Sequence, residues 1–229
     1  DQIDWKTGKS TIAGRNDHAG GPQANDSTCT VCHVADSGKE FDASVVGAHT
    51  IPAQSKQLKG INVEITRITN TAPGQYPNVI FTAKDKSGKA LMLSDIASMT
   101  LAVAGPTTDY TNYRTETATL ARAAIGADGS FAYTLAQPIS LNATGTYAIS
   151  VQAGRTQTIV GNGGASANVT VYSGNPVVYV PVTDKVAVPR RQVVSTEKCN
   201  VCHEEIAFHG GGRKNLGEYC QFCHNPAIV

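Results

Sequence analysis

The chain has 229 residues, a net charge of +1 and a hydrophobic content of 41%, which bounds it to one or two domains. The balanced charge gives no argument for nucleic-acid binding or for a polybasic membrane surface. No apolar run approaches the roughly 18 residues of a spanning helix, so we expect no transmembrane segment.

The first 50 residues hold one Cys-x-x-Cys-His pentad, which runs from Cys29 to His33, and two further histidines, His18 and His49. Fifty residues are too few to bury a conventional core. We therefore expect an irregular segment with short helices that depends on cross-links and bound groups for its stability, as small scaffolds do.

Residues 51–190 contain no cysteine and no histidine. Alternating or β-branched stretches separated by turn residues predict about seven short strands, which favours an antiparallel β-sandwich or small barrel. We expect this β module to fold without help from either flank. One stretch, residues 115–126, reads instead as a short helix that ends at Gly126. The predicted strands lie near residues 61–68, 79–83, 98–103, 130–135, 146–151, 167–172 and 177–182.

Residues 191–229 hold two more pentads, Cys199 to His203 and Cys220 to His224, with His209 between them. Three glycines follow His209. They permit a close approach of the backbone to a flat ring, and an ordinary flexible loop is the alternative. This short tail, like the head, is expected to be irregular.

The three pentads use all six cysteines of the chain. Three disulfides, a redox dithiol or half a zinc site would also use Cys-x-x-Cys, but none of these requires a histidine after each second cysteine. The pentad is the attachment signature of a c-type haem, in which two thiols bind the macrocycle and the histidine binds its iron. The sequence predicts three covalent haems on Cys29, Cys32, Cys199, Cys202, Cys220 and Cys223.

Three irons with two axial ligands each need six ligands, and the chain has six histidines. Methionine ligation is the alternative, but Met92 and Met99 lie in the predicted β module. Two imidazoles per iron leave no open position, which favours electron transfer over oxygen chemistry. The predicted ligands are His33, His203 and His224 within the pentads and His18, His49 and His209 outside them.

The tail from Cys199 to Pro226 resembles the segment that opens a haem domain in the outer-membrane decahaem cytochromes of metal-reducing bacteria, the OmcA/MtrC family. Those proteins alternate multihaem and β-barrel-like domains, and the order of this chain resembles a junction between them. The resemblance implies bis-histidine c-haems, a cell-surface location and electron delivery to extracellular acceptors. It also implies that His209 is a distal ligand.

Our first functional interpretation is a bacterial extracellular trihaem cytochrome, exported through the periplasm, for long-range electron transfer. Haems at both ends suit copies that join head to tail as a conductive filament, with His18 or His49 ligating a neighbour's haem. Its expected partners are further copies, other multihaem cytochromes and extracellular acceptors. The alternatives are a terminal metal or flavin reductase, a β module that binds a surface or mineral, and a fragment of a larger decahaem cytochrome.

Overall fold

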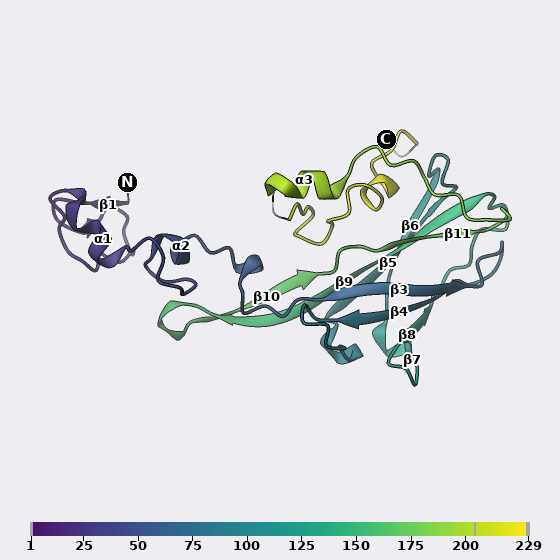
Figure 1. Ribbon diagram of the computed structural model, residues 1–229, viewed down its shortest axis with the longest axis horizontal. Helices are drawn as coiled ribbons and strands as arrows, with labels where there is room; N and C mark the ends of the chain where they lie inside the picture. The colour runs from purple at the N-terminus through teal and green to yellow at the C-terminus, as the bar shows by residue number, and fades with distance from the viewer. Residues whose placement is uncertain (1, 204, 228–229) are drawn as a thin grey trace. The chain divides into compact units, whose positions relative to one another are not determined.

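Figure 1 shows the chain as a computed structural model, in which residues 2–203 and 205–227 are described. The chain divides into two compact units. The head unit comprises the residues up to 57 together with 158–168, and the main unit comprises 58–157 together with the residues from 169 onward. No helix in the described parts combines the length and the apolar character of a membrane span.

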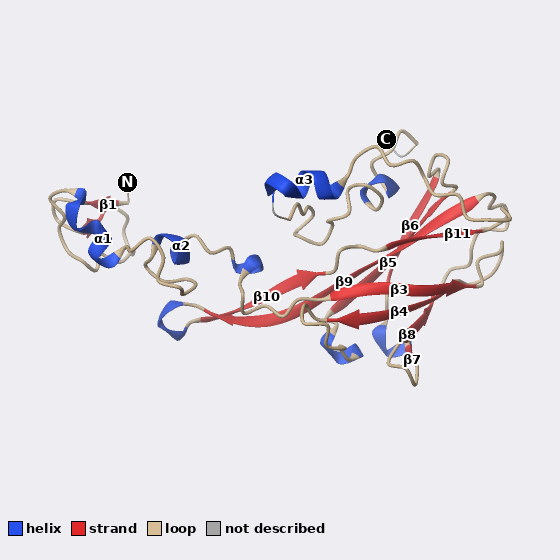
Figure 2. Cartoon of the chain, in the orientation of Figure 1, coloured by secondary structure: helices blue, strands red, loops and turns tan. Residues whose placement is uncertain are grey.

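The head unit is largely irregular, as Figure 2 shows by the share of its chain drawn as loop. The tip of a long hairpin belongs to this unit because Gln57 binds it through both ends of its amide. Its Nε2 donates to the Val160 carbonyl oxygen at 3.0 Å, and its Oε1 accepts from the Val160 amide at 2.8 Å. The regular elements are short: β1 (Ile3–Asp4), β2 (Lys9–Ser10), α1 (Cys29–Cys32), α2 (Val45–Ala48) and 3₁₀ turns at Asp26–Thr28, Pro52–Gln54 and Asn162–Gly164.

The main unit contains two antiparallel sheets, which confirms the predicted fold class. One sheet has the order β10-β9-β5-β6, with β11 paired to β9, and the other has the order β3-β4-β8-β7. All seven predicted strands are present, and β9 is much longer than expected. The strands are β3 (Asn62–Thr69), β4 (Asn78–Lys84), β5 (Ser98–Gly105), β6 (Asn112–Thr117), β7 (Ala124–Ile125), β8 (Phe131–Thr134), β9 (Thr146–Val160), β10 (Ser166–Tyr172) and β11 (Val177–Pro181).

The main core lies between these two sheets. Alternate residues of β4 are buried, among them Val79 and Phe81, and they pack in one cluster with Leu101 of β5 and Ile149 of β9. Met99 belongs to the same cluster. The side chains on the facing sides of the two sheets therefore form a sandwich core. Every buried member of this cluster comes from residues 61–182.

The helix predicted over residues 115–126 is wrong. Residues 112–117 form β6, which pairs with β5 from Thr100 to Gly105, and the rest is a 3₁₀ turn (Leu120–Arg122) followed by β7. The side chain of Glu116 favours the strand over the helix. Its carboxylate accepts from the Tyr133 hydroxyl at 2.8 Å and from the Ala136 amide at 2.8 Å. Tertiary bonds and the β-branched threonines of this stretch outweigh its helical pattern.

The chain after β11 also belongs to the main unit. It contains α3 (Thr196–His203), an isolated bridge between Phe208 and Arg213, and a 3₁₀ turn (Cys220–Phe222). A further 3₁₀ turn, Leu93–Asp95, precedes β5. This C-terminal segment packs on the outer face of the larger sheet, opposite the sandwich core, as described below for the third pentad.

Candidate haem sites

The first pentad lies in the head unit, where α1 carries Cys29 and Cys32 and His33 follows as its C-terminal cap. The His33 amide donates to the Cys29 carbonyl oxygen at 2.8 Å, which closes the helical turn. Both cysteines and His33 line a cavity of about 330 Å³ whose wall also includes Trp5 and His18. One short turn therefore presents two thiols and an imidazole to a single cavity.

The rings of His18 and His33 form a pair beside this cavity. Their planes lie 22° apart and their centroids are separated by 6.3 Å. Two imidazoles that bind one metal ion from opposite sides, through bonds of about 2 Å, have ring centroids about 6 Å apart. The pair is therefore spaced as two axial ligands of one iron would be, and the edge of Trp5 packs against the His18 ring at 5.3 Å.

Both rings are oriented by backbone carbonyl groups. Nδ1 of His18 lies 2.8 Å from the Gly21 carbonyl oxygen, and Nδ1 of His33 lies 2.7 Å from that of Ala43. Because a carbonyl oxygen only accepts, Nδ1 carries the hydrogen in each ring, and Nε2 keeps the lone pair that a metal needs. The head site thus has the outer hydrogen bonds that are typical of metal-binding histidines.

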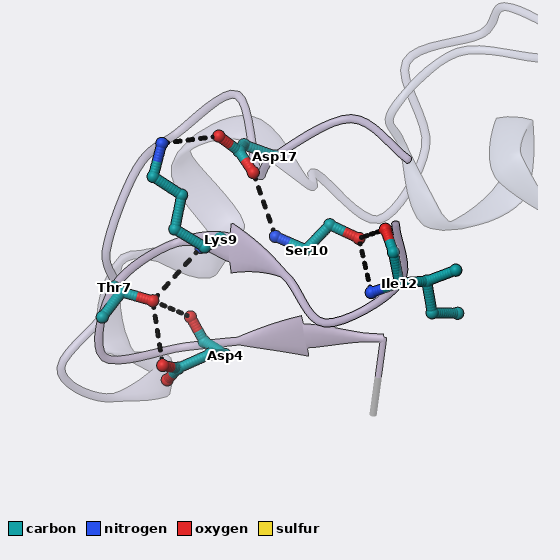
Figure 3. A network of polar contacts seen from close by, with 6 residues as sticks. All are labelled: Asp4, Thr7, Lys9, Ser10, Ile12 and Asp17. Carbon is teal, nitrogen blue, oxygen red and sulfur yellow. Dashed lines mark hydrogen bonds and ion pairs between the residues drawn. The ribbon is translucent and has the colours of Figure 1, made fainter. Parts of the chain in front are cut away.

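The place of His18 is fixed by the β1–β2 hairpin, whose polar contacts are drawn in Figure 3. The carboxylate of Asp17 accepts from Lys9 Nζ at 2.8 Å and from the Ser10 amide at 3.0 Å. The bond from Lys9, with that from Ser10, lowers the pKa of the Asp17 carboxyl. The next residue, His18, donates its amide to the Gly8 carbonyl oxygen at 2.8 Å. The hairpin therefore anchors the chain immediately before the predicted ligand.

The second pentad forms the last part of α3, in the main unit. The helix is tied to the following chain near both of its ends. Thr196 Oγ1 accepts from the Leu216 amide at 2.9 Å, and Asn200 Oδ1 accepts from the Ile206 amide at 2.8 Å. His203 ends the helix with its side chain exposed.

The third pentad begins in a 3₁₀ turn, and the His224 amide closes the turn on the Cys220 carbonyl oxygen at 2.9 Å. The ring of His209 lies beside it, with centroids 6.3 Å apart and planes 40° apart. This separation equals that of the pair in the head unit. The structure thus brings His209 to the third pentad.

His209 opens a tight turn. Its φ is +52°, in the left-handed region that costs energy for a side chain other than glycine, and Gly210 and Gly211 follow with φ of +72° and +85°. The Phe208 amide donates to the Arg213 carbonyl oxygen at 2.9 Å across this turn. The glycine run therefore reverses the chain, and the unusual backbone of His209 directs its ring to His224.

Aromatic residues around the third pentad dock it on the outer face of the larger sheet. Phe222, the third residue of this pentad, is fully buried. The centroid of its ring lies 5.2 Å from that of Tyr110 and 5.4 Å from that of Tyr219. These rings pack in a second core cluster with Ala102, Ala104 and Ala148 of the sheet. Small residues on β5 and β9 leave room for them.

Asn175, in the loop between β10 and β11, ties the turn of His209 to the sandwich. It is fully buried, with a φ of +55°. Its amide nitrogen donates to the Gly212 carbonyl oxygen at 3.0 Å, and its Oδ1 accepts from the Lys214 amide at 2.8 Å. Neither Asn175 nor the aromatic cluster was predicted from the sequence. The one signal was the third pentad itself, which has Phe222 where the other two have valine.

His49 and His203 are the two histidines that the structure pairs with no other ring, and all six histidines are among the described residues. All six cysteines are described as well, and none forms a disulfide. In the described part of the chain, no three His, Cys, Asp or Glu side chains converge on one metal-sized site. What the structure assembles is two sets of paired imidazoles with adjacent thiols, and these donors fit a covalently attached haem.

Comparison with known proteins agrees with this chemistry. Residues 191–229 match the family model described as outer membrane cytochrome MtrC/MtrF-like, domains II/IV. The fold is similar to that of MtrC from Shewanella baltica OS185, with a TM-score of 0.63 and 17% identity over 98% of this chain and 42% of that one. The outer membrane decahaem cytochrome OmcA gives a TM-score of 0.47 and 15% identity over 73% and 28%. No curated protein sequence matches the chain.

The predicted resemblance to the OmcA/MtrC cytochromes is therefore confirmed. The family model supports it in the tail, and the fold of MtrC supports it along nearly the whole chain. The chain spans less than half of that MtrC structure.

Proposed function

We propose that the chain is an extracellular electron-transfer protein that carries three c-type haems, each on one Cys-x-x-Cys-His pentad. The observation that carries the proposal is the spacing of two histidine pairs, His18 with His33 and His209 with His224, each at 6.3 Å beside a pentad. A bound haem supplies a one-electron iron couple whose potential depends on its ligands and surroundings.

The residues of the chain have distinct roles in this proposal. The thiols of each pentad hold the macrocycle, and the adjacent histidine is one axial ligand. Carbonyl groups of Gly21 and Ala43 hold the head imidazoles in the tautomer that leaves Nε2 for the iron. At the two sites where histidines are paired, both axial positions are filled and no coordination site is left for a substrate. This argues for electron transfer and against a terminal reductase that binds its metal or flavin substrate at the iron.

The location and the partners follow from the resemblance. MtrC and OmcA are named as outer-membrane cytochromes, so we place this chain outside the cell or at its outer surface, reached by export through the periplasm. Other multihaem cytochromes and extracellular acceptors are then its electron partners. Copies of the chain that join head to tail would extend the haem row. The 42% coverage of MtrC favours a second candidate, a section of a longer multihaem chain, which the mass of the native polypeptide tests.

Intact-mass measurement of the exported protein tests the haem count. We expect the polypeptide mass plus three haems, and loss of one haem when Cys29 and Cys32 are both replaced by alanine. Two haems or fewer in the unaltered protein would contradict the proposal, and a high-spin signal from its oxidised assembled form would favour the reductase.

Substitution of His209 tests the ligand assignment. His209→Ala should leave three haems attached but convert one iron from low-spin to high-spin or water-bound, since its pair loses one imidazole. Phe208→Ala is the matched control, because its side chain is 49% exposed and lies next in the chain. An unchanged spectrum for His209→Ala would reject the assignment.

A further inference from the structure

Two of the six histidines are unused by the pairs described above. His49 lies in the head unit and His203 in the main unit, and each has an exposed side chain. His203 belongs to a pentad, so its haem has one axial ligand and needs a second. His49 belongs to no pentad and is the one histidine left to provide it.

His49 has the same preparation for metal binding as the paired histidines of the head. Its Nδ1 lies 2.7 Å from the Val45 carbonyl oxygen, one helical turn earlier, so Nε2 keeps its lone pair. The three head histidines therefore share one device, a ring nitrogen fixed by a backbone carbonyl group. His18 and His33 also have each other's ring as a partner. His49 has the same hydrogen bond but no partner ring among the described histidines of its own chain.

The helix that ends at His49 is held firmly. Ser44 caps α2 and accepts from the Gly47 amide at 3.0 Å, while Asp42 Oδ1 accepts from the Ser44 amide at 3.0 Å. A Cβ on Gly47 would collide with Asp42 Oδ1 and lie 2.8 Å from the backbone carbonyl oxygen of Lys39, so a larger residue would displace this turn. The Val45 amide also donates to the carbonyl oxygen of Val34, at 2.9 Å, close after the first pentad. His49 is thus built into the same framework as the head site.

The surface around His49 suits contact with an apolar macrocycle. Residues 43–55 contain no charged side chain. Within them Val45, Val46 and Ile51 are 51%, 54% and 56% exposed. Three exposed apolar side chains close in the chain to an oriented imidazole offer apolar contact to a macrocycle bound there.

Net charge adds an attraction between the head of one copy and the body of another. Residues 1–50 carry seven acidic and four basic side chains, whereas residues 51–229 carry eleven acidic and fifteen basic ones. Opposite net charges steer an encounter and favour head-to-body over head-to-head approach. Each copy also offers one His49 and one haem site that lacks a ligand. In a row of copies each His49 can fill the site of the next copy, which leaves one unused His49 at one end and one incomplete haem site at the other.

We propose that His49 of one copy is the sixth iron ligand of the haem held by His203 of a second copy. This inference rests on the proposed function, since it requires a haem on the second pentad. The contact is heterologous, so repetition builds a row unless its rotation closes a ring. The unit that holds the first haem of one copy then also provides a ligand to the second haem of its neighbour. The bond between His49 and the neighbour's iron would then both join the two copies and bring their haems into one electron path.

Two variants of the full-length haem protein test the proposal. His49→Ala should keep three haems, turn one of its three irons high-spin or water-bound, and abolish growth beyond single copies. Added imidazole should restore the low-spin signal without restoring assembly, which separates loss of a ligand from misfolding. Thr50→Ala, the neighbouring substitution, should retain both the low-spin state and assembly.

Mixing decides which chain provides the ligand. The double variant Cys199→Ala/Cys202→Ala keeps His49 but lacks the second haem. Mixed with His49→Ala, it should restore the low-spin signal and give a complex with one copy of each chain, because neither partner can extend further. Failure of the mixture to restore the signal would show that His49 serves its own chain, and a fully low-spin His49→Ala protein would show that it is no ligand. Either result overturns the proposal and leaves the proposed function intact, whereas fewer than three haems in the unaltered protein defeats the proposed function itself.

Discussion

Replacing Phe222 by alanine tests how the third haem site is held on the sandwich. The side chain is fully buried between Tyr110 and Tyr219, with ring centroids 5.2 and 5.4 Å away. Truncating a buried phenylalanine costs about 3–5 kcal/mol, and part of this is the loss of two aromatic contacts of about 0.5–1.5 kcal/mol each. The cost should fall on the tail, because the sandwich core draws its buried members from residues 61–182.

Hydrogen exchange in the exported haem protein measures this cost where it arises. A loss of about 3–5 kcal/mol raises the opening equilibrium by roughly two to four orders of magnitude, so amides of residues 205–225 should exchange faster by that factor. Amides in β4 and β8 should keep their protection. Mass should first confirm that the variant retains three haems.

The matched control is Val201→Ala, which changes the same position of the second pentad. Val201 is 85% exposed, so its truncation should alter stability by no more than about 0.5 kcal/mol. Equal effects of the two substitutions, or an equal loss of protection in β4 and in the tail for Phe222→Ala, would refute the docking argument.

Three further predictions concern the same contacts. Burial raises the pKa of Tyr110 to about 12, above its ordinary value of about 10. The folded state therefore favours the neutral phenol. The contribution of this group to the stability of the fold is complete below pH of about 10 and is lost as the pH rises through 12. Tail-amide protection should fall in that window, less so in Tyr110→Phe. Asn175→Ala should destabilise the turn of His209 by about 2–4 kcal/mol, because it removes both hydrogen bonds of the side chain and is strained at positive φ. Asn175→Gly removes the same bonds without the strain and should cost less; similar effects of the two variants on exchange would contradict the strain argument. Residues 52–188 made without haem should unfold cooperatively as a β protein, and a disordered product would show that the haem segments are integral to its core.

The strands of the main unit were predictable because each buries one face in a local period-two pattern. Stretches such as Asn62–Thr69 and Asn78–Lys84 need no information from the rest of the chain to show that pattern. Residues 115–126 failed for the opposite reason. Their conformation depends on pairing with β5 and on the bonds of Glu116, both of which are tertiary.

The candidate sites divide in the same way. The pentads are local motifs, so the residues that attach haem could be proposed from spacing alone. The partners of the distal histidines could not, because the approach of His18 to His33 depends on the β1–β2 hairpin and that of His209 to His224 on a turn with positive φ. The docking role of Asn175 depends on contacts between segments about 40 residues apart in the chain, such as that with Lys214, which no local pattern encodes.

Quantitative electron paramagnetic resonance of the oxidised, assembled protein tests the central claim most directly, because it counts low-spin and high-spin ferric ions separately. The account predicts three low-spin ions per polypeptide and no high-spin ion beyond those at assembly ends, since six histidines fill six axial positions. Fewer than three ferric haems per polypeptide, or a high-spin ion in every copy of the assembled protein, would contradict it.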